Sequence, residues 1–139
     1  MNNITNLPKI ILPGQQELRA AVSKLNTKFP GMFKNVKEIR VAPGGAGYGF
    51  VNNKEMGVIF IDYAKIKSTV SGRYGAQDPK IIEEAIINSL AETITHEAAH
   101  IDDNLEHGEF PAENKARQVM QQLLAACNLF AKYAKHYSS

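Results

Sequence analysis

Cysteine is nearly absent from this sequence, and so are long apolar runs. Cys127 is the one cysteine in 139 residues, which excludes an intramolecular disulfide and is compatible with a reducing compartment. The N-terminal stretch MNNITNLPKIILPGQQ has no basic segment followed by a long apolar one, and its apolar piece, residues 10–12, lies between Pro8 and Pro13. We therefore expect no signal peptide, no transmembrane segment and a cytoplasmic location.

The sequence also lacks a marked excess of one charge. It carries 16 Lys and Arg against 14 Asp and Glu, a net charge of +2, and no run of basic residues that could follow a phosphate backbone. We expect neither a nucleic-acid nor a membrane partner. With 44% hydrophobic residues, no internal repeat and no low-complexity segment, residues 1–139 are expected to form a single domain, and the oligomeric state stays open.

Apolar spacing predicts three helices. In segment 15–29, QQELRAAVSKLNTKF, apolar residues recur at steps of three and four. A longer helix is predicted from residue 79 to about residue 105, with Asp78 as its N-cap. A final helix is predicted over residues 112–137, where the apolar residues again keep helical spacing.

Two or three strands are expected between the first two helices. Residues 36–41 alternate imperfectly, and residues 57–61, GVIFI, are the most β-prone run and the best candidate for a buried strand. Phe50 and Val51 follow the glycine-rich PGGAGYG, which lacks the features of a phosphate-binding loop and is interpreted as a hairpin or cleft-rim loop. Residues 63–79 contain several breakers and are assigned no element.

Strands grouped together, with helices on either side of them, predict an α+β fold. We expect a small, mostly antiparallel sheet of two to four strands. The N-terminal helix, the long central helix and the C-terminal helix are expected to pack on one face of this sheet.

The residues 96–100, HEAAH, are the strongest chemical signal in the chain. In a helix, His96 and His100 lie roughly 40° apart on one face, so two imidazoles one turn apart can hold one zinc ion. Glu97 lies beside them and can reach an activated water without binding the metal. The alternative is an ordinary helix face with two histidines on it.

A zinc ion needs a third protein ligand, and five downstream residues are candidates. Glu113 is preferred because in the predicted final helix it shares a face with apolar Met120 and Leu124, where a carboxylate needs a partner. His107 is the chief alternative. The other three candidates are Asp103, Glu106 and Glu109.

HEAAH, a loop, and then FPAENKA at the head of another helix resemble the zincin metallopeptidases, and more narrowly their small gluzincin-like members. The resemblance covers residues 57 to about 125. It implies a zincin-like fold in which His96, His100 and Glu113 bind Zn²⁺. The metzincin pattern requires a glycine and a histidine at the positions that Asp103 and Glu106 occupy here, so the chain departs from that group.

The resemblance also implies a reaction, the hydrolysis of peptide bonds in a peptide or protein substrate. Glu97 would be the catalytic general base for a water that zinc activates. Arg73, Tyr74 and His107 are candidates to contact the substrate or the oxyanion. The strand at residues 57–62 would lie at the sheet edge beside the cleft, where an extended peptide can pair with it.

The sequence is also compatible with two alternative hypotheses about function. In one, the chain has the zincin-like fold and binds zinc but is a catalytically weak or inactive interaction or regulatory protein. In the other, HEAAH is accidental and the chain is a helical interaction protein without metal.

Overall fold

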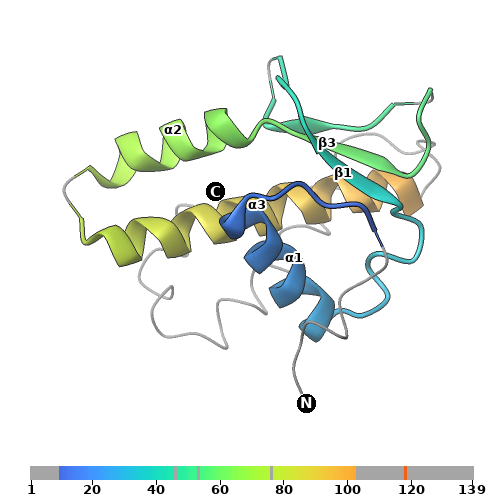
Figure 1. Cartoon of the computed structure of the whole chain (residues 1–139), viewed down its shortest axis with the longest axis horizontal. Helices are drawn as coiled ribbons and strands as arrows, with labels where there is room; N and C mark the ends of the chain where they lie inside the picture. Colours follow the sequence, from blue (N-terminus) through green and yellow to red (C-terminus); the bar gives the residue numbers. More distant parts are fainter. Residues whose placement is uncertain (1–9, 46, 53, 76, 103–117, 119–139) are drawn as a thin grey trace.

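The computed structural model describes residues 10–45, 47–52, 54–75, 77–102 and 118 (Figure 1). Over these residues the chain is a small α+β fold with a three-stranded mixed sheet. The predicted helix at 15–29 and the predicted strands at 36–41 and 57–61 are confirmed, with ends shifted by at most two residues. In chain order the elements are α1 (Gln16–Lys28), β1 (Glu38–Val41), β2 (Gly49–Phe50), β3 (Val58–Ile61), α2 (Tyr63–Tyr74) and α3 (Pro79–Asp102).

The sheet order β1-β3-β2 corrects two expectations about the strands. The pair β1–β3 is parallel and spans four residues, whereas β2–β3 is antiparallel and spans two, so the sheet is not mostly antiparallel. The chain reverses once before β2 and once after it, so β1 and β3 run the same way with β3 between its neighbours. The strand expected at the edge is therefore central, and all four of its residues are buried.

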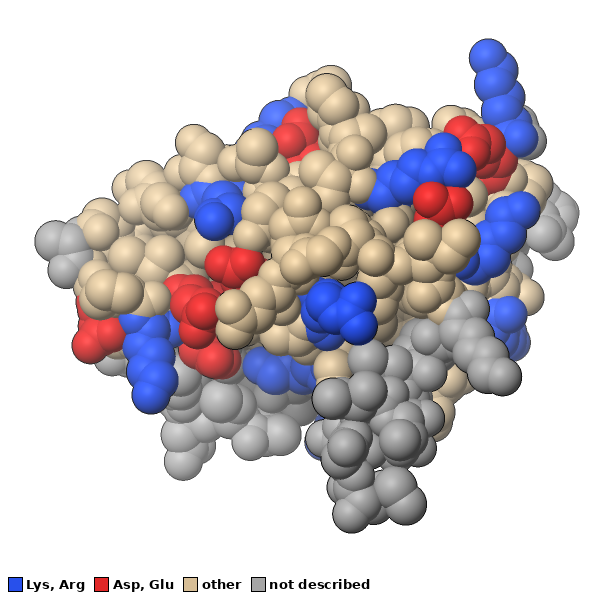
Figure 2. All heavy atoms as spheres, viewed as in Figure 1, with Lys and Arg blue, Asp and Glu red and all other residues tan. Residues whose placement is uncertain are grey.

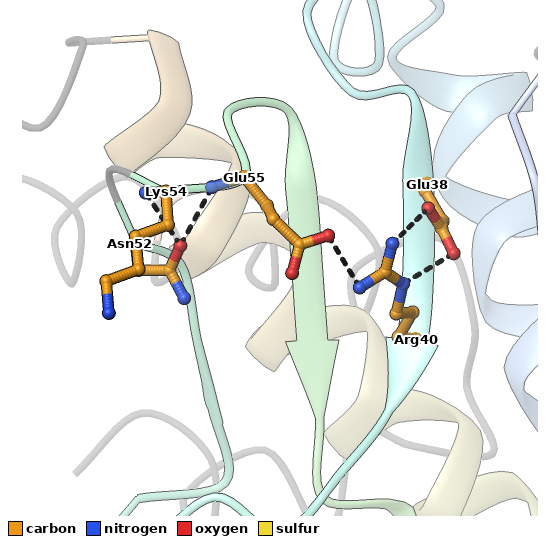
Figure 3. A network of polar contacts seen from close by, with 5 residues as sticks. All are labelled: Glu38, Arg40, Asn52, Lys54 and Glu55. Atoms are coloured by element: carbon orange, nitrogen blue, oxygen red, sulfur yellow. Dashed lines mark hydrogen bonds and ion pairs between the residues drawn. The ribbon is translucent and has the colours of Figure 1, made fainter.

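One face of the sheet packs into the main core, and the other carries charged side chains. Ile39, Ile59 and Ile61 belong to the main core, which they share with the helices. Residues alternating with them along a strand point the other way. On that outer face Arg40 donates two hydrogen bonds to Glu38 and forms an ion pair with Glu55, as Figure 3 shows.

Helix α3 is the central element and packs against α1, α2 and the sheet (Figure 1). It begins as predicted: the Asp78 side chain accepts a hydrogen bond from the Lys80 amide at 2.8 Å, which satisfies one of the free N–H groups of the first turn. The predicted helix is confirmed as far as Asp102. The rest of it, and the predicted helix at 112–137, lie outside the described residues apart from the helical residue 118.

Helix α2 was not predicted from the sequence. Its N-cap is Asp62, which accepts the Lys65 amide, and its buried residues Ile66, Val70 and Tyr74 recur every fourth position. Of the breakers in this segment, the helix accommodates Gly72, and it ends only at Gly75, whose φ is 52°. Capping and one buried stripe are thus enough to form the helix despite the glycines.

On the face shown in Figure 2, acidic and basic side chains are interspersed over the described part of the chain. None of the helices in the described ranges combines the length and the apolar character that crossing a membrane requires.

Candidate metal centre

The HEAAH segment lies in the last two turns of α3. Ala98 and Ile101 of these turns, and Ile94 just before them, are buried in the core and fix the rotation of the helix about its axis. That rotation leaves His96 half-buried and places His100 and Glu97 at the edge of the buried region, with 9% and 7% of their surfaces exposed. The site residues therefore lie on a helix whose opposite face is packed into the core.

The two imidazoles converge. His96 Nε2 lies 3.3 Å from His100 Nε2, the ring centroids are 5.0 Å apart, and the ring planes are inclined by 63°. Two ligands of a tetrahedral zinc at 2.0–2.1 Å stand about 3.3–3.4 Å from each other. The histidine pair thus already has the spacing of two ligands of one zinc ion. A hydrogen bond between one protonated and one unprotonated ring nitrogen also fits this distance.

The edge strand β2 borders this end of α3. Gly49 is packed so closely that a Cβ atom there would lie 2.9 Å from Thr93 Cγ2 and 2.8 Å from the Phe60 carbonyl oxygen. Thr93 is one turn before Glu97 on the same side of the helix. Gly49 pairs with Ile61, and the neighbouring Asp62 amide donates to the Tyr48 carbonyl. Because hydrogen-bonded and non-hydrogen-bonded pairs alternate along an antiparallel pair of strands, the backbone N–H and C=O groups of Gly49 point away from β3.

All five candidates for the third metal ligand lie outside the described residues. They are Glu113, His107, Asp103, Glu106 and Glu109. Within the described ranges, no three His, Cys, Asp or Glu side chains are grouped closely enough to hold a metal ion. The structure therefore supplies two converging ligands, and the identity of the third stays a prediction.

Arg73 and Tyr74 lie at the opposite end of α3 from the histidines. They form the end of α2, just before the turn that leads to Pro79 (Figure 1). From Pro79 to His96 the helix rises about 25 Å. The structure does not bring Arg73 and Tyr74 together with the HEAAH residues.

Sequence reasoning missed two features that connect β2 to its surroundings, the close approach of Gly49 to Thr93 of α3 and the hydrogen bonds of Lys65 to the glycine-rich loop. The glycines of PGGAGYG were the available signal, since a glycine in a strand often marks a close backbone approach. Comparison of the chain with protein-family models, with curated proteins and with solved structures finds no match.

Proposed function

We propose that the protein is a zinc-dependent metallopeptidase whose centre is built on His96 and His100 of α3. The observation that carries this proposal is the 3.3 Å separation of the two Nε2 atoms, the spacing of two ligands on one tetrahedral zinc. The resemblance of HEAAH and the following residues to the gluzincin-like zincins supports it. A peptide or protein substrate and a cytoplasmic location belong to the same proposal.

Each residue of the proposed centre has a separate role, either binding the metal or accepting the proton of water. His96 and His100 present unprotonated Nε2 atoms to the metal, and Glu113 is the proposed third ligand. Zinc, when bound, lowers the pKa of water and polarises the scissile carbonyl. Glu97, with 7% of its surface exposed, accepts the proton of the attacking water and passes it to the leaving amine.

Metal content and cleavage, measured on the same samples, test this proposal. We expect the purified chain to hold one zinc ion per molecule and to cleave members of a library of internally quenched peptides. Glu97→Gln should keep the zinc and lower kcat by about 100-fold or more, the usual contribution of a general base. Glu83→Gln, on the same helix but more than three turns before Glu97, is the matched control and should change neither quantity.

The outcomes separate the alternative functions. Zinc bound at one per chain with no cleavage of any peptide would favour the zinc-binding interaction protein. No zinc in the wild type after incubation with ZnCl₂ would favour the helical interaction protein without metal, in which HEAAH is accidental. Cleavage by Glu97→Gln at the wild-type rate would remove Glu97 as the base.

A further inference from the structure

The glycine-rich segment before β2 is held by two charged residues at the start of α2. The segment comprises residues 43–45, 47 and 48 of those that the structure describes. Lys65 Nζ donates to the carbonyl oxygens of Gly45 and Gly47, the latter at 2.7 Å, and lies 4.0 Å from Asp62 Oδ2. That same Asp62 oxygen accepts a hydrogen bond from the Gly44 amide at 2.9 Å. One ammonium and one carboxylate thus bind both the carbonyl and the amide groups of the segment.

The segment is shaped to receive this ammonium. Gly45 has a φ of 62°, a conformation that glycine adopts readily, and the Gly47 amide closes a turn onto the Gly44 carbonyl at 3.1 Å. A Cβ atom on Gly44 would lie 2.8 Å from the Gly47 carbonyl oxygen, so the turn has no room for a side chain there. Lys65 Nζ also lies 5.8 Å from the centre of the Tyr48 ring. The glycines allow two carbonyl groups to converge on one cation.

The contacts of Lys65 and Asp62 with the glycine-rich segment, here called the clamp, lead directly into β2, the strand that packs against α3 at Thr93. Tyr48, the last residue of the segment, accepts a hydrogen bond from the Asp62 amide at 2.8 Å and leads directly into β2. The next residue, Gly49, is the one packed against Thr93 of α3. The clamp therefore fixes the segment immediately before the point where β2 meets the helix that carries Glu97.

We propose that Lys65 is a positioning residue that sets β2 against the HEAAH helix. Its side chain contacts the glycine-rich segment and Asp62, so it acts on the HEAAH helix through that segment and β2. Its effect on the position of β2 is independent of the proposed function. Its effect on peptide binding rests on that function, with an extended substrate pairing with the backbone groups of Gly49 that point away from β3. The two effects are measured separately.

The first measurement is amide hydrogen exchange by NMR in the full chain. Lys65→Met removes the charge but keeps the length of the side chain. We expect exchange at the Gly44, Gly47 and Asp62 amides to rise by about tenfold, the effect of losing one charge-assisted hydrogen bond. The Thr93 methyl resonance should shift as well. The amide of residue 65 should be unchanged, because it is bound by the Asp62 cap rather than by its own side chain.

Two variants control this measurement. Lys65→Arg keeps the charge and should restore most of the protection. Lys54→Met neutralises an exposed lysine in the turn after β2, whose backbone amide donates a hydrogen bond to the Asn52 side chain (Figure 3). It should leave exchange as in the wild type. Wild-type exchange at Gly44 and Gly47 in Lys65→Met, an equal rise in Lys54→Met, or an unmoved Thr93 methyl would each overturn the proposal.

The second measurement is cleavage of the best peptide of the library by the zinc-loaded chain. We expect Lys65→Met to raise KM about tenfold with kcat and zinc content within twofold of wild type, and Lys65→Arg to reverse this change. A general loss of folding would lower zinc content as well. An unchanged KM with a shifted Thr93 methyl would reject the link to the site. If the wild type holds no zinc or cleaves nothing, the proposed function fails, and the exchange data still decide whether Lys65 sets β2.

Discussion

The phenolic hydroxyl of Tyr63 donates a hydrogen bond to Glu17 Oε1 at 2.5 Å, which joins the first turn of α2 to the first turn of α1. Lys67 Nζ lies 4.0 Å from the other oxygen of the same carboxylate and 5.2 Å from the centre of the Tyr63 ring. The hydrogen bond from Tyr63 is the largest influence on the Glu17 carboxyl and holds its pKa below the ordinary 4.5. Burial, followed by the bond to Glu17, raises the pKa of Tyr63 to about 12.

The pair should stabilise the fold between two pH limits. Because the pKa of Glu17 is lower in the folded state, its contribution is present above about pH 4.5 and is lost as the pH falls. Because the pKa of Tyr63 is higher in the folded state, its contribution is complete below pH 10 and is lost as the pH rises toward 12.

Tyr63→Phe tests this relationship. We expect it to raise the pKa of Glu17 toward 4.5, followed by the carboxyl carbon shift in NMR, and to lower the free energy of unfolding by about 1 kcal/mol at neutral pH. The stability difference between Tyr63→Phe and wild type should shrink as the pH falls below about 4.5. A Glu17 pKa that does not move would show that the hydrogen bond is not what lowers it.

Two glycines should respond to alanine in opposite directions. At Gly49 a new Cβ would meet the Phe60 carbonyl at 2.8 Å, and backbone cannot easily retreat, so Gly49→Ala should cost about 1–3 kcal/mol of stability. Gly72 lies inside α2 with nothing within 4 Å of the added atom, so Gly72→Ala should stabilise by about 0.5–1 kcal/mol. Urea denaturation measures both. Equal effects at the two positions would contradict the close packing at Gly49.

Asn88 is a polar residue of α3 that lies in the core of the protein. It is fully buried, and neither its amide nitrogen nor its amide oxygen has a hydrogen-bond partner in the part of the chain that the structure describes. A buried amide without partners costs about 1–3 kcal/mol, which offsets the packing that its side chain provides. Asn88→Ala should therefore change stability by less than about 1 kcal/mol.

Leu90→Ala is the matched control for Asn88→Ala, because Leu90 is equally buried on the same helix. It should cost about 2–5 kcal/mol by opening an apolar cavity. Thermal or urea unfolding gives both values. A loss of more than about 2 kcal/mol in Asn88→Ala would mean that its amide makes hydrogen bonds in solution, for example to a buried water.

Elements with strong local signals could be predicted from the sequence. Asp78 before Pro79, followed by apolar residues at helical spacing, correctly indicated where α3 begins. The spacing of His96 and His100 correctly indicated that their rings could converge, because a helix brings residues four apart to one face. Both inferences depend on neighbours within a few residues.

Features decided by distant contacts could not be predicted. The run Val58–Ile61 fits a central strand and an edge strand equally well, and only pairing with both β1 and β2 distinguishes them. Helix α2 was missed because its glycines suggested loops while its cap, Asp62, was read as the end of a strand. The contacts of Lys65 join positions 18 and 20 residues away, which no local pattern records.

The third zinc ligand is the decisive test of the gluzincin-like proposal. Glu113 and His107 both lie outside the described residues, so the prediction rests on the sequence. Glu113 falls on the apolar face of the predicted final helix, where a carboxylate is costly unless it is paired or bound to metal. It would also approach from a separate element, which suits a tetrahedral site better than a third ligand on the histidine helix. His107 has a good donor atom but follows the histidine helix in sequence.

We therefore expect Glu113→Ala to release zinc to a moderate chelator such as 4-(2-pyridylazo)resorcinol, while His107→Ala retains it. Losing a direct ligand should weaken zinc binding by more than the roughly 10–100-fold that follows loss of a residue supporting a ligand. The opposite result, release from His107→Ala only, would make the centre a three-histidine site. If both variants hold zinc as tightly as wild type, the ligand must be sought among Asp103, Glu106 and Glu109, and the gluzincin-like arrangement would be rejected. His96→Ala is the positive control, because removing one of the two converging nitrogens should abolish zinc binding in any of these arrangements.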